Sequence, residues 1–142
     1  LGPPATRRDG DGALAAEGLT FADGKLVAAP PDRDFSREPI LMLRIVKAAR
    51  DRCLAIHPLA IRALIRHARK AETLRGEDEA GALFIDLLMG KDAAKWLRLL
   101  NETGFMGRFV PEWQRIVGLM QFDTYHVFTV DEHTIEAIGV LQ

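Results

Sequence analysis

The chain has 142 residues, 48% of them hydrophobic, and a formal net charge of −1 at pH 7. This is enough apolar material for one domain with a buried core. The near-zero, interspersed charge argues against nucleic-acid binding and against an anchor to an acidic membrane, and no apolar run approaches the roughly 20 residues of a membrane helix. Cys53 is the only cysteine, so no internal disulfide framework is possible. With no signal-peptide pattern, these features predict a cytoplasmic protein.

The N-terminal part predicts a tail followed by a small hairpin. Residues 1–18 are rich in Gly, Pro, Ala and charge without any period, as in a mobile tail or linker. Two short β-compatible stretches, Leu19–Phe21 and Leu26–Val27, then flank the dipeptide Asp23-Gly24. Because Asp-Gly tolerates the positive φ angles of a tight primed turn, we expect a β-hairpin over residues 19–28.

From residue 36 onward, apolar residues recur with the period of helices. Ser36 is expected to cap the first helix and Pro58 to open the second, while Gly90 ends the third and Gly104 gives the fourth a left-handed cap. Four stripes define these helices: Leu41, Ile45, Ala48 and Ala49; Ile61, Leu64, Ile65 and Ala68; Ala80, Leu83, Phe84, Leu87 and Leu88; Ala93, Trp96, Leu97 and Leu100.

Two further helices are expected near the C-terminus. Pro111 is placed to start the fifth, and Thr129 with Glu132 fits a capping box for the sixth, which continues through Ile135 and Ile138. Six helices with short connections predict an all-α fold: an irregular helical bundle behind a small N-terminal β-hairpin.

Two stretches are more specific than these patterns. They read NETGFMGRFVPEW at residues 101–113 and MQFDTYHVFTVDEHT at residues 120–134. Together they resemble the joint between the helical middle region and the metal-dependent HD domain in bifunctional PII uridylyltransferase/uridylyl-removing enzymes. The resemblance covers residues 35–142 and is most specific over 97–135. Leu100, Phe105-Met106 and Trp113 depart from the usual residues only by apolar exchanges of similar bulk.

The resemblance implies that the chain is a piece of a larger enzyme. Such an enzyme transfers UMP from UTP to the PII signal protein with Mg²⁺, and its HD domain hydrolyses the UMP off in response to glutamine. Residues 1–18 would then be a tail or linker, 19–122 the helical middle domain after the nucleotidyltransferase domain, and 123–142 the start of the HD domain. We expect the piece to be a scaffold between the two active sites, inactive alone, with no bound cofactor.

One histidine is a candidate metal ligand by the same resemblance. His133, in the Glu-His-Thr sequence, would be the first HD-domain ligand to Mn²⁺ or another divalent ion, which would lower the pKa of the attacking water. The partner His-Asp pair of such a site is absent from this sequence, and an isolated helical histidine is more often a surface residue. A ligand role for His126 is weaker, because packing of Tyr125 and His126 at a chain turn accounts for them.

The remaining candidates each have a structural alternative. The Asn101–Gly104 sequence offers polar groups for a catalytic loop, but the same residues serve helix ends and turns, and Arg108 near Glu112 suggests a surface ion pair. The indoles of Trp96 and Trp113 fit core packing, and Cys53 fits an inert core position. A basic cluster fits a solvated face or a contact with an acidic partner; it comprises Arg62, Arg66, His67, Arg69 and Lys70.

Two other functional classes remain open on the sequence. One is a self-contained helical module that binds a protein partner in a groove. The other is a piece of a different HD-type phosphohydrolase. An exposed apolar patch or a defined oligomer would favour the first, and a different upstream domain would favour the second.

Overall fold

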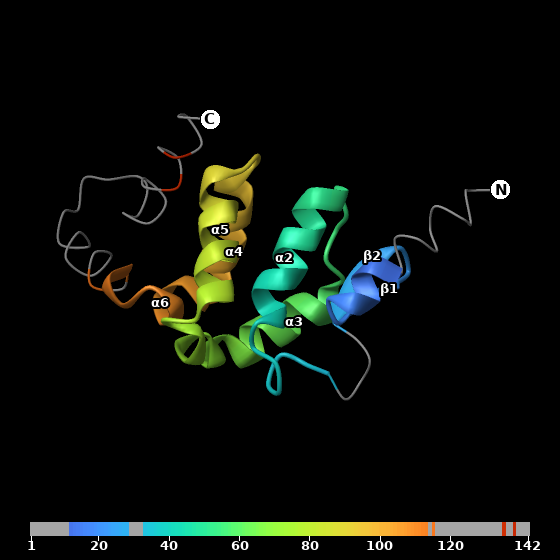
Figure 1. The fold of residues 1–142 in the computed structure, drawn as a ribbon, viewed down its shortest axis with the longest axis horizontal. Coiled ribbons are helices and arrows are strands. Elements are labelled where there is room, and N and C mark those ends of the chain that lie inside the picture. The colour runs from blue at the N-terminus through green and yellow to red at the C-terminus, as the bar shows by residue number, and fades with distance from the viewer. Residues whose placement is uncertain (1–11, 29–32, 114, 116–134, 136–137, 139–142) are drawn as a thin grey trace. The chain divides into compact units, whose positions relative to one another are not determined.

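The computed structural model describes residues 12–28, 33–113, 115, 135 and 138 (Figure 1). The described chain is mostly helical and has two short strands, so the predicted all-α class with a small hairpin is confirmed. The contacts within the chain divide it into two compact units, Leu1–His67 and Ala68–Gln142. The domain boundary expected at residue 122 lies outside the described residues.

The first unit contains the predicted hairpin. Strand β1 (Leu19–Ala22) pairs antiparallel with β2 (Lys25–Ala28), and the turn residues Asp23 and Gly24 have φ angles of 54° and 74°. Two positive φ angles are what a primed hairpin turn requires. The other edge of β2 is also paired: the Leu26 amide donates to the Ala55 carbonyl at 3.0 Å, and the His57 amide donates to the Leu26 carbonyl at 2.9 Å.

Part of the segment expected to be an N-terminal tail is folded. Residues 12–16 are helical, and Leu14 within them is completely buried. The prediction of a tail over residues 1–18 is therefore wrong for residues 12–18, where one buried leucine among small residues is enough to fix a helical turn.

Helix α2 (Leu41–Arg52) is the centre of the first unit, since most of its apolar residues are buried. Its start differs from the prediction, which placed the N-cap at Ser36. The Asp34 carboxylate instead accepts the amides of Ser36 and Arg37, both at 3.0 Å, and this fixes a turn before the helix. The helix ends at Cys53, whose φ is 54°.

Helix α3 (Pro58–His67) begins at the predicted proline. Its predicted apolar stripe is only partly correct, because Leu64 is buried whereas Ile65 is largely exposed. After His67 the α-helix gives way to a 3₁₀ helix, η1 (Ala68–Leu74), at the boundary between the two units.

The second unit comprises η1, α4 (Asp78–Met89), α5 (Ala93–Glu102) and α6 (Phe105–Phe109), and α4 and α5 lie side by side (Figure 1). Gly90 follows α4 as predicted. The fourth stripe is fully confirmed by burial: Ala93, Trp96, Leu97 and Leu100. The short helix α6 lies between the fourth and fifth predicted helices and was not itself predicted.

The predicted C-terminal helices are described in part. Residues 111–113 are helical, as expected after Pro111, and residues 135 and 138 are also helical, with Ile135 completely buried. The capping box at Thr129 and Glu132 lies outside the described residues. No helix in the described part of the chain combines the length and apolar character needed to cross a membrane.

Candidate functional site

Residues Asn101–Gly104 form the corner between α5 and α6, which we call the NETG corner. Thr103 is buried, and its hydroxyl donates to the Leu100 carbonyl at 3.1 Å. Gly104 then turns the chain with a φ of 92°, the left-handed conformation that glycine adopts without steric cost. The predicted left-handed cap is confirmed, and this part of the motif is built by helix-ending chemistry.

Asn101 connects the corner to the next segment of the chain. Its side-chain Oδ1 accepts a hydrogen bond from the indole Nε1–H of Trp113 at 2.8 Å. Trp113 is half-buried, so the prediction of simple core packing misses its main contact. The bond holds residues 111–113 against the end of α5.

Arg108 in α6 makes a second connection, to η1. Its Nη1 lies 2.8 Å from Oε1 of Glu72, and the Nε of Arg75 donates to the Arg108 carbonyl at 2.7 Å. The predicted pair with Glu112 is therefore wrong, since the arginine takes a carboxylate 36 residues earlier in the sequence. Arg108 and Glu72 are each about half exposed, so the pair itself contributes under about 1 kcal/mol.

Aromatic rings also hold α6 in place. The ring centroid of Phe109 lies 5.2 Å from that of Phe84 in α4 and 5.3 Å from that of Phe105. Phe105 and Met106 are buried, so this apolar segment packs into the second unit.

The geometry of the NETG corner favours a structural role. Its amide oxygen and its hydroxyl are both engaged in holding helix ends, and Glu102 is exposed. Within the described ranges, no group of three or more His, Cys, Asp and Glu side chains is placed to hold a metal ion.

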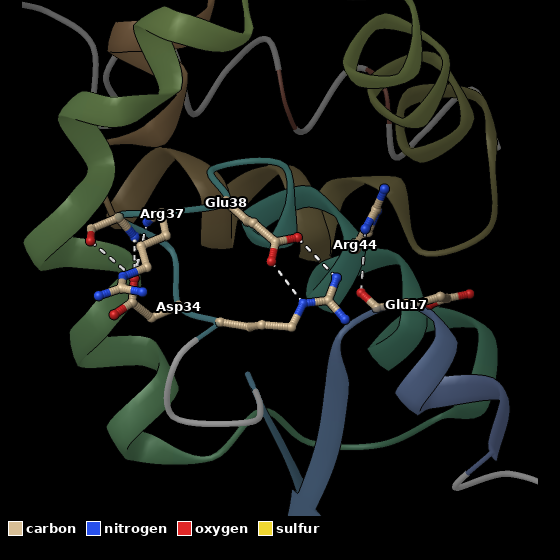
Figure 2. A network of polar contacts seen from close by, with 7 residues as sticks. Glu17, Asp34, Arg37, Glu38 and Arg44 are labelled. Carbon is tan, nitrogen blue, oxygen red and sulfur yellow. Dashed lines mark hydrogen bonds and ion pairs between the residues drawn. The ribbon is translucent and has the colours of Figure 1, made fainter.

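A separate polar network lies in the first unit, before α2 (Figure 2). Both carboxylate oxygens of Glu38 accept from the Arg33 guanidinium, at 2.7 and 2.9 Å, and these hydrogen bonds lower the pKa of Glu38. The pKa of Asp34 is lowered by the hydrogen bond from the Arg37 amide and then by that from the Ser36 hydroxyl. The sequence analysis did not predict this pair, although Arg33 and Glu38 are only five residues apart.

Comparison with known proteins identifies the chain. A family model described as the uridylyltransferase GlnD third domain matches residues 21–109. The chain belongs to this family. The matched segment runs from the hairpin to α6 and covers parts of both units. Membership of this family decides against the alternative of a different HD-type phosphohydrolase.

Curated relatives of this GlnD third domain carry the name bifunctional uridylyltransferase/uridylyl-removing enzyme. The protein from Gluconobacter oxydans is 43% identical over 113 residues, 75% of this chain and 12% of its own length. The protein from Azospirillum brasilense is 41% identical over 139 residues, 96% of this chain and 14% of its own length. The chain thus spans about one-eighth of the length of these relatives. No solved structure matches it.

The predicted metal ligand is not placed by the structure of this GlnD third domain. His133 and His126 both lie outside the described residues. The ligand role of His133 therefore stays a prediction.

Three other predictions concern Cys53, Trp96 and the basic cluster. Cys53 is exposed in a left-handed cap position after α2, so its assignment to the core is wrong: a helix end, unlike a helix interior, turns its last residue toward solvent. Trp96 is buried as predicted, and the Nζ of Lys95 lies 4.7 Å from the centroid of its ring. The basic cluster is mainly solvent-exposed, as a solvated face requires: Arg62, Arg66, Arg69 and Lys70 are exposed and His67 is half-buried.

Proposed function

We propose that this chain is the GlnD third domain of a bifunctional enzyme that transfers UMP from UTP to the PII signal protein and removes it by hydrolysis in response to glutamine. The observation that carries the proposal is the family match over residues 21–109, together with about 40% identity to relatives that carry the bifunctional name. Mg²⁺ would serve the transfer reaction, and residues 123–142 would begin the HD domain, with His133 as its first metal ligand.

We further propose that the piece acts as a scaffold between the two active sites. The contacts of the NETG corner support this role, because they use the motif's polar groups to hold one segment against another. The Asn101–Trp113 bond fixes the chain as it leaves α6, and the Arg108–Glu72 and Arg75–Arg108 contacts fix α6 on η1. A segment held at several points sets the direction in which the chain continues toward the proposed HD domain.

The enzymatic part of the proposal is tested by a UTP-dependent assay of PII modification and removal. The 142-residue chain and the intact enzyme that contains it are compared with PII, glutamine and Mg²⁺ supplied. We expect both activities in the intact enzyme and neither in the 142-residue chain. Absence of both activities from the intact enzyme would refute the proposal.

The scaffold part is tested in the intact enzyme with Glu102→Gln, which removes the exposed carboxylate of the NETG corner and keeps its shape. A scaffold role predicts rates of transfer and removal within about twofold of the parent. Loss of a catalytic acid or base typically lowers a rate by about 10²–10⁴-fold, and a loss of that size in either activity would overturn the structural assignment.

A further inference from the structure

The large exposed apolar side chains of the described residues are concentrated on two helices. Leu59 and Ile65 on α3 are 62% and 55% exposed, and Ile85 and Met89 on α4 are 59% and 75% exposed. Exposed apolar residues scattered singly need no explanation, so these four residues become informative only together with the charges around them.

The two helices carry opposite charge. The charged side chains of α3 are basic, with exposed Arg62 and Arg66 and no acidic residue in the helix. Those of α4 are acidic, namely Asp78, Glu79 and Asp86, with no basic residue in the helix.

Helical spacing places the charges among the apolar residues. On α4, the sequence Asp78, Ala82, Ile85 and Met89 advances by four, three and four positions, so these exposed residues share one face. On α3, Leu59, Arg62 and Arg66 advance by three and four positions, and Ile65 is three positions after Arg62. We call these the basic face of α3 and the acidic face of α4.

We propose that the basic face of α3 in one copy of this chain docks on the acidic face of α4 in a second copy. The apolar residues of the two faces would cover one another, and the surrounding arginines would oppose the aspartates. The partner is a second copy because every copy of the chain carries both the basic face of α3 and the acidic face of α4. Each such contact joins two copies of the chain. This association is independent of the proposed enzymatic function.

Sedimentation velocity of the 142-residue chain over a concentration series tests the association without any substitution. We expect a reversible change from monomer to dimer as the concentration rises, with the transition moving to higher concentration in high salt because ions screen the opposed charges. A chain that stays monomeric up to the high micromolar range overturns the proposal.

Charge reversal separates this contact from any other dimer. One variant carries Arg62→Glu and Arg66→Glu, so both of its faces are acidic. The other carries Asp78→Lys and Asp86→Lys, so both of its faces are basic. We expect each variant alone to be monomeric and an equimolar mixture to form a heterodimer, because each acidic face then meets a basic one.

The mixture also controls for folding, since recovery of the dimer shows that both variants retain their faces. A matched control, Lys25→Glu with Lys70→Glu, changes the same net charge at exposed positions outside both faces and should leave the dimer intact. Dimers that persist in both charge-reversed variants, or a wild-type dimer that Ile85→Ser with Met89→Ser does not weaken, would assign the interface elsewhere.

Discussion

Gly18 should be far less tolerant of alanine than Gly24, although both glycines have positive φ angles, of 85° and 74°. A Cβ atom at Gly18 would lie 2.8 Å from Cδ2 of Leu41 and 3.0 Å from Nη2 of Arg33. A Cβ atom at Gly24 would meet nothing within 4 Å. The two positions therefore share the backbone cost of the substitution and differ in the steric cost.

The magnitudes follow from these two terms. Holding an L-residue in the left-handed conformation costs about 1–2 kcal/mol at either position. Gly18→Ala adds the cost of overpacking, about 1–3 kcal/mol, because the new Cβ would press on Leu41, which is completely buried. We expect Gly18→Ala to lower the free energy of unfolding by about 2–5 kcal/mol and Gly24→Ala by about 1–2 kcal/mol.

Urea denaturation followed by far-UV circular dichroism measures the difference, read as a shift in midpoint at constant slope. The Leu41→Ala background supplies the decisive control, because it removes the atom that a new Cβ would meet at 2.8 Å. In that background the added cost of Gly18→Ala should fall toward that of Gly24→Ala. Equal costs for the two glycines in the wild-type background would refute the steric argument.

Substitutions at three further sites test individual contacts. Trp113→Phe should cost about 1 kcal/mol of unfolding free energy in urea denaturation by removing the donor to Asn101. His57→Ala should cost about 0.5–2 kcal/mol because the His57 Nδ1 accepts the Leu59 amide at 3.0 Å near the start of α3, whereas His57→Asn should retain most of that stability. Because the folded-state pKa of Asp34 is lowered, its stabilisation is present above about pH 4 and is lost as the pH falls through the folded pKa. The stability difference between wild type and Asp34→Asn should therefore shrink on acidification, and an unchanged difference between pH 6 and 3 would contradict this assignment.

The elements predicted well are those specified by neighbouring residues. Asp23-Gly24 fixes a hairpin turn within four residues, Pro58 is suited to a first helical position, and Gly104 ends α5 through its own φ angle. The stripe of α5 is confirmed by burial because its four buried residues recur at helical spacing on one face. In each case the physical cause lies within one or two turns of chain, which a sequence pattern can register.

The misassigned residues depend on partners that the local sequence leaves undetermined. Arg108 has Glu112 four positions away, yet it pairs with Glu72, because packing of α6 against η1 brings that carboxylate within 2.8 Å. Similarly, Ser36 has the composition of an N-cap, but Asp34 takes up the nearby amides first and delays the helix to Leu41. An exposed ion pair is worth too little to determine packing, so its partner follows from the fold.

The polar groups of the NETG corner form hydrogen bonds within the chain, and this favours a structural interpretation of the motif. A catalytic loop keeps its reactive groups available to a substrate, whereas here Asn101 and Thr103 make intramolecular hydrogen bonds. Left-handed Gly104 has an equally local purpose, since any other residue there would carry the steric cost of positive φ. Substitutions in the NETG corner should therefore be assayed first as changes of stability.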